Sequence, residues 1–504
     1  MFEHIISSMI FLPIIAGLIL LLTPVTKNGA RAMALVVSVA VLILGLKLYT
    51  GFIGAGGMEF VENYVWFPSL GINYTLGVDG ISLFILMAGT VLFPSIFLIF
   101  TTKSKGYYAN LLIAQGAMAG AVCAGDLMLF YIFWEVMLLP IFFMIGLFGG
   151  EGKIAATLKI TLYTIAGSLL MLAAIFYLGV AFHNQFGIWS FNIVNMAALK
   201  LHGTVAVLAF VGFMLAFAIK IPLFPFHTWL PDAYTEGPAA ATFVLSAIMA
   251  KIGVYAVIRF VIPIFGAEFT RYALIMAYLG VIGMMYCGFA AIAQKDFKRM
   301  LAFSSASHMG IIALGLFCMN IQALTGSLFQ IVAHATSTGA LFLFAGILEE
   351  RMQTRKIADL GGIAGRAPVF AMFFAIAMLA SVGLPGTSGF IGEFLIILGA
   401  IKYNVAIGVL AGTSLIIGVC YMLWMFQRVF FEKSNERTEK FRDLSAAEVL
   451  AFLPILVLII VMGIYPQPFI KKIEPAARIQ INTILHNMQV ADANALLQGT
   501  NLEK

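Results

Sequence analysis

The chain has 504 residues, of which 62% are hydrophobic and only 10% are charged, with a formal net charge of +6. A soluble domain typically carries about 25% charged residues, so this sequence has too few charges to cover a water-exposed surface of its size. The composition therefore excludes a soluble enzyme, a secreted disulfide-rich scaffold and a disordered regulator. It predicts a protein that lies in a lipid bilayer.

Long apolar runs predict an all-α polytopic membrane protein. A helix needs about 20 apolar residues to cross a hydrocarbon core about 30 Å thick. The strands of a membrane barrel would instead alternate over about ten residues. In chain order, the fourteen predicted spans are residues 5–24, 31–50, 79–101, 108–124, 126–148, 157–182, 203–225, 238–261, 271–292, 300–318, 324–348, 368–400, 405–430 and 447–465.

The basic residues predict how these spans are oriented. With both termini outside, 18 of the 29 Lys and Arg residues, Lys298 among them, fall on the inner side and nine, including Arg259, on the outer side. Inner loops of membrane proteins carry such an excess of positive charge. The remaining two, Lys220 and Lys251, fall inside helices. Because the basic residues form no patch, no nucleic acid is expected as a partner.

The segments outside the spans have simpler interpretations. Residues 51–78 and 183–202 are predicted to be outer loops, with Trp66 and Trp189 at the membrane interface. The tail from about residue 470 predicts a surface helix with a frayed end. The four cysteines form no CxxC pair and are predicted to be small buried hydrophobic residues.

Four charged residues lie inside predicted spans, namely Glu135, Lys220, Lys251 and Glu393. Each charge near the centre of a bilayer costs about 2.5–3.5 kcal/mol, so such residues usually face a partner or water and carry a function. The alternative for each residue is a buried ion pair that only fixes the register of two helices. Four such charges together favour the functional interpretation.

Two of these charges lie beside predicted helix breaks. Pro222 and Pro225 follow Lys220, and each proline removes a backbone donor. The stretch Gly383-Leu-Pro-Gly precedes Glu393 in a similar way. Two broken helices that each carry a buried charge indicate a transporter built from repeated halves, and carbonyl groups freed at the breaks need water or protein partners. Two unrelated kinks are the alternative.

Two histidines extend the series of titratable residues. His308 and His334 both lie among small hydroxylated residues, between the Lys251 span and the Glu393 span. A single buried histidine is more often structural, but two in this position indicate a chain of titratable groups. The sequence contains no GxGxxG or HExxH motif and no complete phosphate-binding loop, so no redox centre or nucleotide site is expected in this chain.

The segment from Lys220 to Pro238, followed by Lys251, resembles the core signature of the antiporter-like membrane subunits of respiratory complex I. Phe-Trp-Glu135, Ser-Ser-Ala-Ser-His308-Met-Gly, the His334 span and Gly-Phe-Ile-Gly-Glu393-Phe extend the resemblance over residues 79–430. Glu393 favours the M-type branch of this family, because the sister subunits L and N carry a lysine there.

The resemblance implies a domain organisation and a set of partners. Residues 1–107 would hold three helices, 108–261 and 271–430 two inverted five-helix repeats with a broken helix in each, and 431–504 the last span and the tail. The chain would be flanked by subunits L and N in a bacterial inner membrane, in contact with lipid, with both termini in the periplasm. It would hold no cofactor, since flavin, iron–sulfur clusters and quinone belong to partner subunits.

The resemblance also implies a role for each buried residue in a proton-translocating subunit of NADH:quinone oxidoreductase. Glu135 would pair with Lys220, Lys251 would be the central proton carrier and Glu393 the exit-side carrier, with His308 and His334 as the relay between them. A lysine in an apolar site releases its proton more readily unless a carboxylate stabilises its charge. Movement of Glu135 would therefore start proton transfer outward.

Three other functions remain open from the sequence. The nearest is a subunit of a multi-subunit sodium/proton antiporter or of a membrane-bound hydrogenase, whose chains resemble this one over the same spans. A subunit that only scaffolds its neighbours is the second. A ligand-gated channel is disfavoured, because no ring of like charges is evident.

Overall fold

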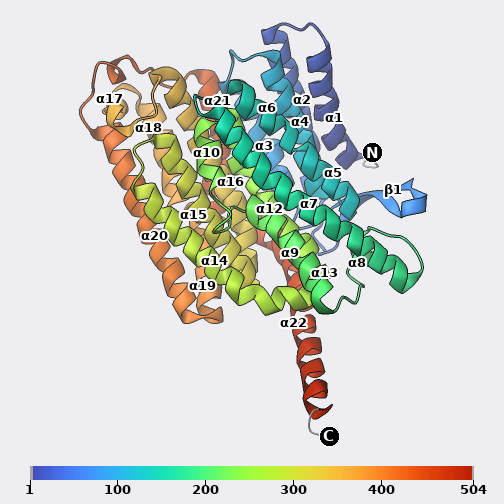
Figure 1. Ribbon diagram of the computed structural model, residues 1–504. Helices are drawn as coiled ribbons and strands as arrows, with labels where there is room; N and C mark the ends of the chain where they lie inside the picture. Colours follow the sequence, from blue (N-terminus) through green and yellow to red (C-terminus); the bar gives the residue numbers. More distant parts are fainter. Residues whose placement is uncertain (1–3, 502–504) are drawn as a thin grey trace.

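The computed structural model describes residues 4–501, with side chains up to residue 489. Helices that pack side by side form the body of the molecule (Figure 1). The first half contains α1 (Ile5–Leu22), α2 (Lys27–Gly51), α3 (Leu83–Ile99), α4 (Lys105–Cys123), α5 (Leu127–Val136), α6 (Leu138–Phe148), α7 (Lys153–Phe186), α8 (Ile193–Met196), α9 (Gly203–Lys220), α10 (Trp229–Glu236), α11 (Ala239–Val244), α12 (Ala250–Ala256) and α13 (Ile262–Ile264). The second half contains α14 (Gly266–Ile292), α15 (Phe297–Phe317), α16 (Ile321–Met352), α17 (Ile363–Arg366), α18 (Pro368–Ser381), α19 (Ser388–Tyr403), α20 (Val405–Phe426), α21 (Ala446–Ile464) and α22 (Gln467–Asn501).

The described helices agree with the predicted spans in position. Eleven helical stretches in residues 4–501 are long and apolar enough to cross a membrane. Two further apolar helices, α3 and α18, have 17 and 14 residues and are shorter than a typical crossing. The number of fourteen crossings therefore stays a prediction.

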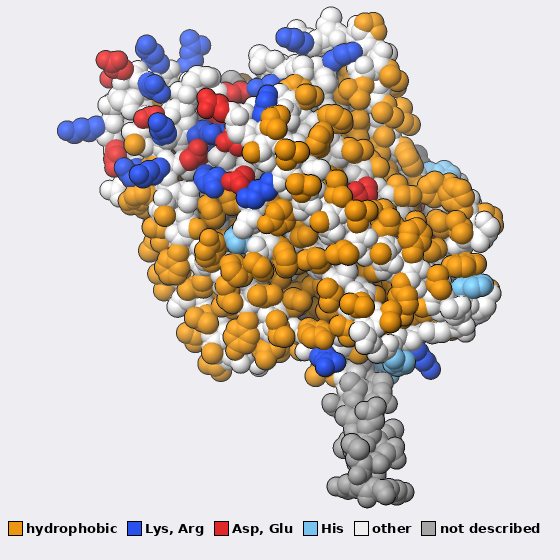
Figure 2. Space-filling view, in the orientation of Figure 1, with side chains coloured by type: hydrophobic (Ala, Val, Ile, Leu, Met, Phe, Trp, Pro, Cys, Tyr) orange, Lys and Arg blue, Asp and Glu red, His pale blue; other side chains and the backbone are white. Residues whose placement is uncertain are grey.

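The surface supports a multi-pass membrane protein. Figure 2 shows that Lys, Arg, Asp and Glu gather at one end of the molecule, whereas hydrophobic side chains cover its wide middle. Leucine, isoleucine, valine and phenylalanine side chains of α1, α7 and α20 are exposed there. Exposed apolar area of this extent needs lipid or protein to cover it.

Both predicted helix breaks are confirmed. The first separates α9, which ends at Lys220, from α10, which begins at Trp229. The second separates α18, which ends at Ser381, from α19, which begins at Ser388. A further break between α5 and α6 was not predicted. Its cause is Pro140, which has no backbone N–H and therefore cannot bond to the carbonyl of Val136 one turn earlier.

The Lys251 span lies at the centre of the helical body. Two π-helical turns, Leu245–Met249 and Val257–Val261, join α11 to α12 and α12 to α13. All residues from 239 to 262 are buried. Single π-helical turns inside α-helices are rare and are often found at functional sites.

The prediction of an outer loop over residues 51–78 is wrong for most of this segment, which forms two strands. Within residues 51–78, β1 (Glu59–Phe67) pairs with β2 (Ile72–Val78) in an antiparallel hairpin. Gly71 supplies a left-handed backbone conformation (φ +64°) at its turn. The buried Glu62 carboxylate accepts a 2.8 Å hydrogen bond from the backbone N–H of Ile6, which ties the hairpin to the start of α1.

The orientation count assumed that Arg259 and Lys298 lie in exposed loops, but both are buried. Arg259 is 7% exposed and its guanidinium lies 2.6 Å from the Asp79 carboxylate. Lys298 is 2% exposed and is paired with Glu349 at 3.1 Å. Each charge is stabilised by a carboxylate from a distant segment, which hydropathy cannot reveal.

Two smaller predictions have mixed outcomes. Three cysteines are buried as expected, but Cys420 is exposed on the apolar outer face of α20. The tail helix α22 begins near the predicted position, at Gln467, and buries Ile473 and Ala477 against the body. The frayed end that the sequence predicts after this helix falls at residues 502–504, which lie outside the described part of the chain.

Candidate functional site

Lys251 is the most deeply buried of the four predicted charges. It lies on α12 with none of its surface exposed. Its Nζ donates a hydrogen bond to the carbonyl oxygen of Ser246, which belongs to the π-helical turn just before α12. The π-helical turn therefore leaves a carbonyl oxygen free for this ammonium group, because it interrupts the regular α-helical bonding.

Lys220 lies at the last residue of α9, where the first break begins. It is 3% exposed, and its Nζ lies 5.0 Å from the ring centroid of Trp134. Among the described residues, it forms no ion pair with Glu135 within 4.0 Å, although Glu135 lies within electrostatic range. The predicted direct pair is absent, and the indole ring beside Glu135 contacts the ammonium group instead.

Glu135 lies next to the unpredicted break between α5 and α6. Its carboxylate oxygen Oε1 is buried and has no hydrogen-bond partner among the described residues. A buried carboxylate oxygen without a partner is costly, so this position favours an ordered water or a movement of the side chain.

A glycine lets the helix that ends at Lys220 pack closely on the helix that carries Lys251. Gly253 lies two residues after Lys251, and a Cβ built on it would lie 3.1 Å from the Cβ of Lys220. The absence of a side chain at Gly253 therefore lets the end of α9 pack directly on α12. The first break and the central lysine meet at this contact.

The two predicted histidines lie side by side. The ring centroids of His308, on α15, and His334, on α16, are 5.3 Å apart. His334 is 1% exposed, and among the described residues neither of its ring nitrogens has a hydrogen-bond partner. Lys251 lies within electrostatic range of this ring. A buried imidazole with two free nitrogens can take part in a relay through water.

His308 connects the pair of rings to Glu393. Its Nδ1 lies 3.0 Å from Oε1 of Glu393, and its Nε2 lies 3.5 Å from the Ser381 hydroxyl at the second break. Glu393 is 1% exposed and also accepts a 3.1 Å hydrogen bond from Nε2 of Gln330. The structure thus places His334, His308 and Glu393 in one buried polar cluster.

A small cavity adjoins this cluster. It has a volume of about 10 Å³ and is lined by His308, Glu393, Ser307, Ser414 and Tyr421, among others. This is close to the smallest volume that holds about one water molecule. The opposite carboxylate oxygen of Glu393, Oε2, is buried without a partner in the described part of the chain. The cluster can therefore exchange a proton with a bound water.

Sequence reasoning missed three residues of the site. Gln330 lies one helical turn before His334, and a polar residue in an otherwise apolar span was a usable signal for it. Trp134 entered only as part of the Phe-Trp-Glu135 motif, and Ser381 carried no signal, because aromatic residues and serines are common in membrane helices. Only the three-dimensional contacts identify these two.

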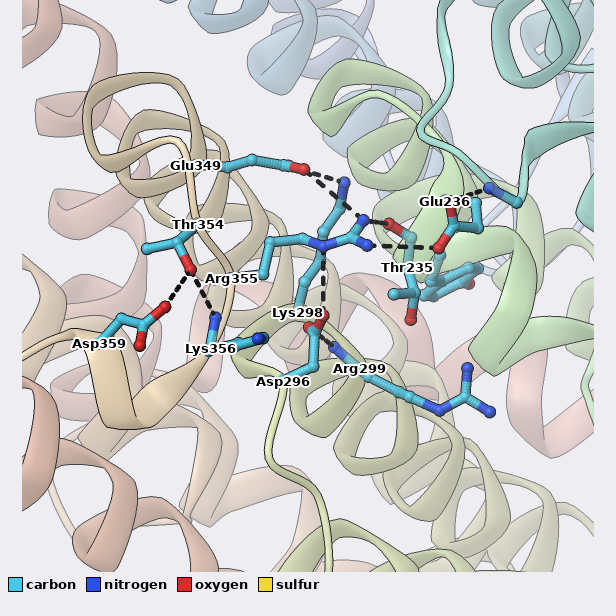
Figure 3. Close-up of polar contacts among 12 residues, drawn as sticks. Thr235, Glu236, Asp296, Lys298, Arg299, Glu349, Thr354, Arg355, Lys356 and Asp359 are labelled. Atoms are coloured by element: carbon cyan, nitrogen blue, oxygen red, sulfur yellow. Dashed lines mark hydrogen bonds and ion pairs between the residues drawn. The ribbon is translucent and has the colours of Figure 1, made fainter.

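A second polar cluster surrounds Arg355, which follows the end of α16 (Figure 3). The Arg355 guanidinium reaches the Thr235 carbonyl oxygen at 2.6 Å, Glu236 at 3.3 Å, Asp296 at 3.1 Å and Glu349 at 3.6 Å. Thr235 and Glu236 end α10, while Asp296 caps α15. Arg355 therefore connects the segment after the first break to the second half of the chain.

Lys298 strengthens the same connection. Its Nζ donates a 2.5 Å hydrogen bond to the carbonyl oxygen of Gly237 and lies 3.1 Å from the Glu349 carboxylate. Gly237 lies directly between α10 and α11, which leads to Lys251. We refer to Glu236, Asp296, Lys298, Glu349 and Arg355 as the polar clasp.

Comparisons with known proteins agree with this architecture. The family model described as NADH:quinone oxidoreductase/Mrp antiporter, transmembrane, matches residues 124–418. NADH-quinone oxidoreductase subunit M of Rhodobacter capsulatus is 35% identical, covering 99% of both chains. A chain of respiratory complex I from Thermus thermophilus superposes with a TM-score of 0.88 at 33% identity, over 95% of this chain and 99% of that one.

A chain of the Mrp complex from Dietzia sp. DQ12-45-1b shares the fold, with a TM-score of 0.83 at 22% identity over 96% of this chain and 99% of that one. The identity to the subunit M relative is higher and extends over the whole length. The chain therefore belongs to the NADH:quinone oxidoreductase/Mrp antiporter family, as an antiporter-like membrane subunit similar to subunit M of complex I.

Proposed function

We propose that this chain is the subunit of an NADH:quinone oxidoreductase that moves protons across the membrane, driven by electron transfer in other subunits. The observation that carries the proposal is the buried cluster of His334, His308 and Glu393 beside Lys251. Titratable groups inside a membrane are costly and mark ion pathways. Its relatives named subunit M support the assignment to this complex.

In the proposed path, a proton passes from Lys220 to Lys251 and onward through His334 and His308 to Glu393. The 3.0 Å contact between His308 and Glu393 is short enough for direct transfer. The other steps need intervening water, because no direct hydrogen bond among described residues joins Lys251 to His334 or Lys220 to Lys251. Glu135 controls the first step through its charge.

The proposal extends to the surroundings of the chain. Subunits of the L and N types would flank it in a bacterial inner membrane, with both termini on the periplasmic side. The flavin, the iron–sulfur clusters and the quinone site would lie in partner subunits, and this chain would contribute only residues that hold and move protons.

Replacement of Glu393 tests the proposed path. In the assembled complex, Glu393→Ala should lower the number of protons pumped per electron while leaving assembly and quinone reduction in place. Gln330→Leu, which removes one hydrogen bond to the same carboxylate, should have a smaller effect. Normal pumping in Glu393→Ala would overturn the role of this residue.

Mass spectrometry of the gently solubilised complex separates this function from its nearest alternative. We expect subunits that bind flavin, iron–sulfur clusters and quinone to accompany the chain. A complex that contains only antiporter-type membrane subunits would favour a sodium/proton antiporter, whose fold this chain also shares.

A further inference from the structure

An apolar groove runs along one side of the molecule, close to Glu135. It has a volume of about 560 Å³ and lies between α1, α4 and α6. Its walls include Leu18, Ile113, Val136, Leu139 and Phe143. Volumes of about 300–1,000 Å³ are typical of sites that bind small molecules.

The groove matches one leaflet of a bilayer in length. Its lining runs from Val136 to Phe148, which at 1.5 Å per residue corresponds to about 18 Å. Half of a hydrocarbon core is about 15 Å thick. Leu139 and Phe143 are 57% and 45% exposed, so the groove is open to the surrounding lipid.

Positive charge marks one end of the groove. Lys105 Nζ donates hydrogen bonds to the carbonyl oxygens of Leu21 at 3.3 Å and Thr23 at 2.9 Å, and Lys153 Nζ donates to the carbonyl oxygen of Leu147 at 3.2 Å. Leu21 and Leu147 themselves line the groove. Neither lysine forms an ion pair with a carboxylate in the described part of the chain, so both charges are available to an anion.

From this arrangement we propose that the groove binds an anionic phospholipid. One acyl chain lies between α1, α4 and α6, and the phosphate lies between Lys105 and Lys153. A long apolar groove with two ammonium groups that have no carboxylate partner at one mouth matches an acyl chain joined to a charged headgroup. Gly106, at the same mouth, has open space where a side chain would project, which leaves room for the glycerol backbone.

The bound lipid has a consequence for the proposed function and in this respect rests on it. Val136 and Pro140 lie on the two sides of the break between α5 and α6, one and five residues after Glu135, and both line the groove. An acyl chain packed against both sides holds this break in place. Loss of the lipid would therefore loosen the position of Glu135.

Photolabelling of the whole complex tests the lipid site without reference to pumping. The complex is reconstituted in phosphatidylcholine vesicles that contain a photoactivatable phosphatidylglycerol, and labelled residues are located by mass spectrometry. We expect labelling within residues 106–113 and 136–148. Photoactivatable phosphatidylcholine with the same acyl chain should label these segments far less.

Three variants make the test specific. Because each lysine near an anionic headgroup contributes about a five-fold change in binding, Lys105→Gln and Lys153→Gln should each lower labelling about five-fold. Gly106→Leu should block the mouth of the groove. Gly412→Leu is the matched control, since a side chain there also meets open space but lies on α20, outside the groove.

Three outcomes would overturn the proposal. The first is equal labelling by the anionic and the zwitterionic lipid, and the second is labelling that neither lysine variant changes. The third is capture of a neighbouring protein subunit, instead of lipid, by a photo-crosslinking residue placed at Leu139. If labelling is as expected but Lys251 variants pump protons normally, the lipid site stands and only the proposed function is contradicted.

Discussion

Glu393 is held in a pocket whose shape depends on one glycine. Gly383 has a left-handed backbone conformation (φ +71°), and a Cβ built on it would lie 2.6 Å from Oε2 of Glu393. This is the carboxylate oxygen that has no partner among the described residues. The second helix break therefore positions the carboxylate from two sides, through Gly383 and through Ser381, which contacts His308.

Gly383→Ala should impair the function of Glu393. The substitution adds about 1–2 kcal/mol of backbone strain and forces the carboxylate to move. Gly386→Ala is a matched control, because Gly386 also has a positive φ (+91°) but its Cβ would meet nothing within 4 Å. Proton pumping by the reconstituted complex should fall clearly in Gly383→Ala and much less in Gly386→Ala. Equal losses would show that strain alone, and not the contact with Glu393, matters.

At the scale of elements, the polar clasp joins α10 and α11 to α15 and α16. Arg355 provides most of its contacts, and Lys298 is its most deeply buried member (Figure 3). Because α11 leads directly to the π-helical turn before Lys251, the clasp fixes one end of the helix that carries the central lysine. Its ion pairs are partly buried, so removal of one partner leaves the opposite charge partly buried without compensation.

Arg355→Gln should loosen this connection. Loss of the charge removes several charge-assisted hydrogen bonds, each of which contributes about 1.5–3 kcal/mol. We expect faster thermal inactivation of the complex and more rapid hydrogen exchange in residues 237–249. Arg355→Lys, which keeps the charge, should restore part of the protection. Unchanged exchange in this segment would contradict a role for Arg355 in holding it.

The pairing of α10 with its neighbours should depend on pH. Burial alone would raise the pKa of the Asp232 carboxyl, but hydrogen bonds from Lys159 at 2.7 Å and Arg299 at 2.9 Å hold this pKa below its usual range. When folding lowers the pKa of a carboxyl, its ionised form stabilises the folded state at pH values above the ordinary pKa of about 3.9. This contribution is lost as the pH falls through the lower pKa of the folded state.

Asp232→Asn should therefore lower the thermal stability of the complex at neutral pH by a small amount, since each partly exposed pair contributes about 0.2–1 kcal/mol. The difference from the unmodified complex should shrink as the pH falls below about 3.9 and should disappear only below the lower pKa of the folded state, where the carboxyl is protonated in both states. Thermal inactivation measured over this pH range checks the expectation. A difference that stays constant with pH would contradict it.

For the whole molecule, the sequence predicts the positions of the helices well, because apolar length and helix-breaking prolines are local properties. The breaks after Lys220 and after Ser381 follow from Pro222, Pro225 and the Gly383-Leu-Pro-Gly stretch. The hairpin over residues 59–78 was missed, because its aromatic residues were explained by a position at the membrane interface. Its strands are defined by pairing with each other, which composition does not reveal.

Part of the site could also be predicted, because a charged residue within an apolar span is a local property of the sequence. Charged residues in apolar spans identify Lys251 and Glu393 without a structure, since such residues are rare. The π-helical turns beside Lys251 could not be predicted, because the same residues are compatible with a continuous α-helix. The partners of Arg259 and Lys298 also lie far away in sequence, at Asp79 and Glu349, so only the fold reveals these buried pairs.

The buried cluster is built on two long central helices and on α19, which follows the second helix break and carries Glu393. α15 and α16 carry His308, Gln330 and His334, and nearly all of their residues are buried. Such a rigid surrounding holds the titratable groups in place, while the breaks at α9 and α18 leave carbonyl groups that water can satisfy. A scaffold without transport would not need this arrangement of unpaired polar atoms.

The central claim is that Lys251 carries protons, and proton pumping per electron in Lys251→Met tests it most directly. The measurement uses the assembled complex reconstituted in vesicles, with Lys200→Met, at an exposed position, as the control. We predict that Lys251→Met assembles and still transfers electrons to quinone but pumps fewer protons, whereas Lys200→Met pumps normally. Unimpaired pumping by Lys251→Met would contradict the proposed path.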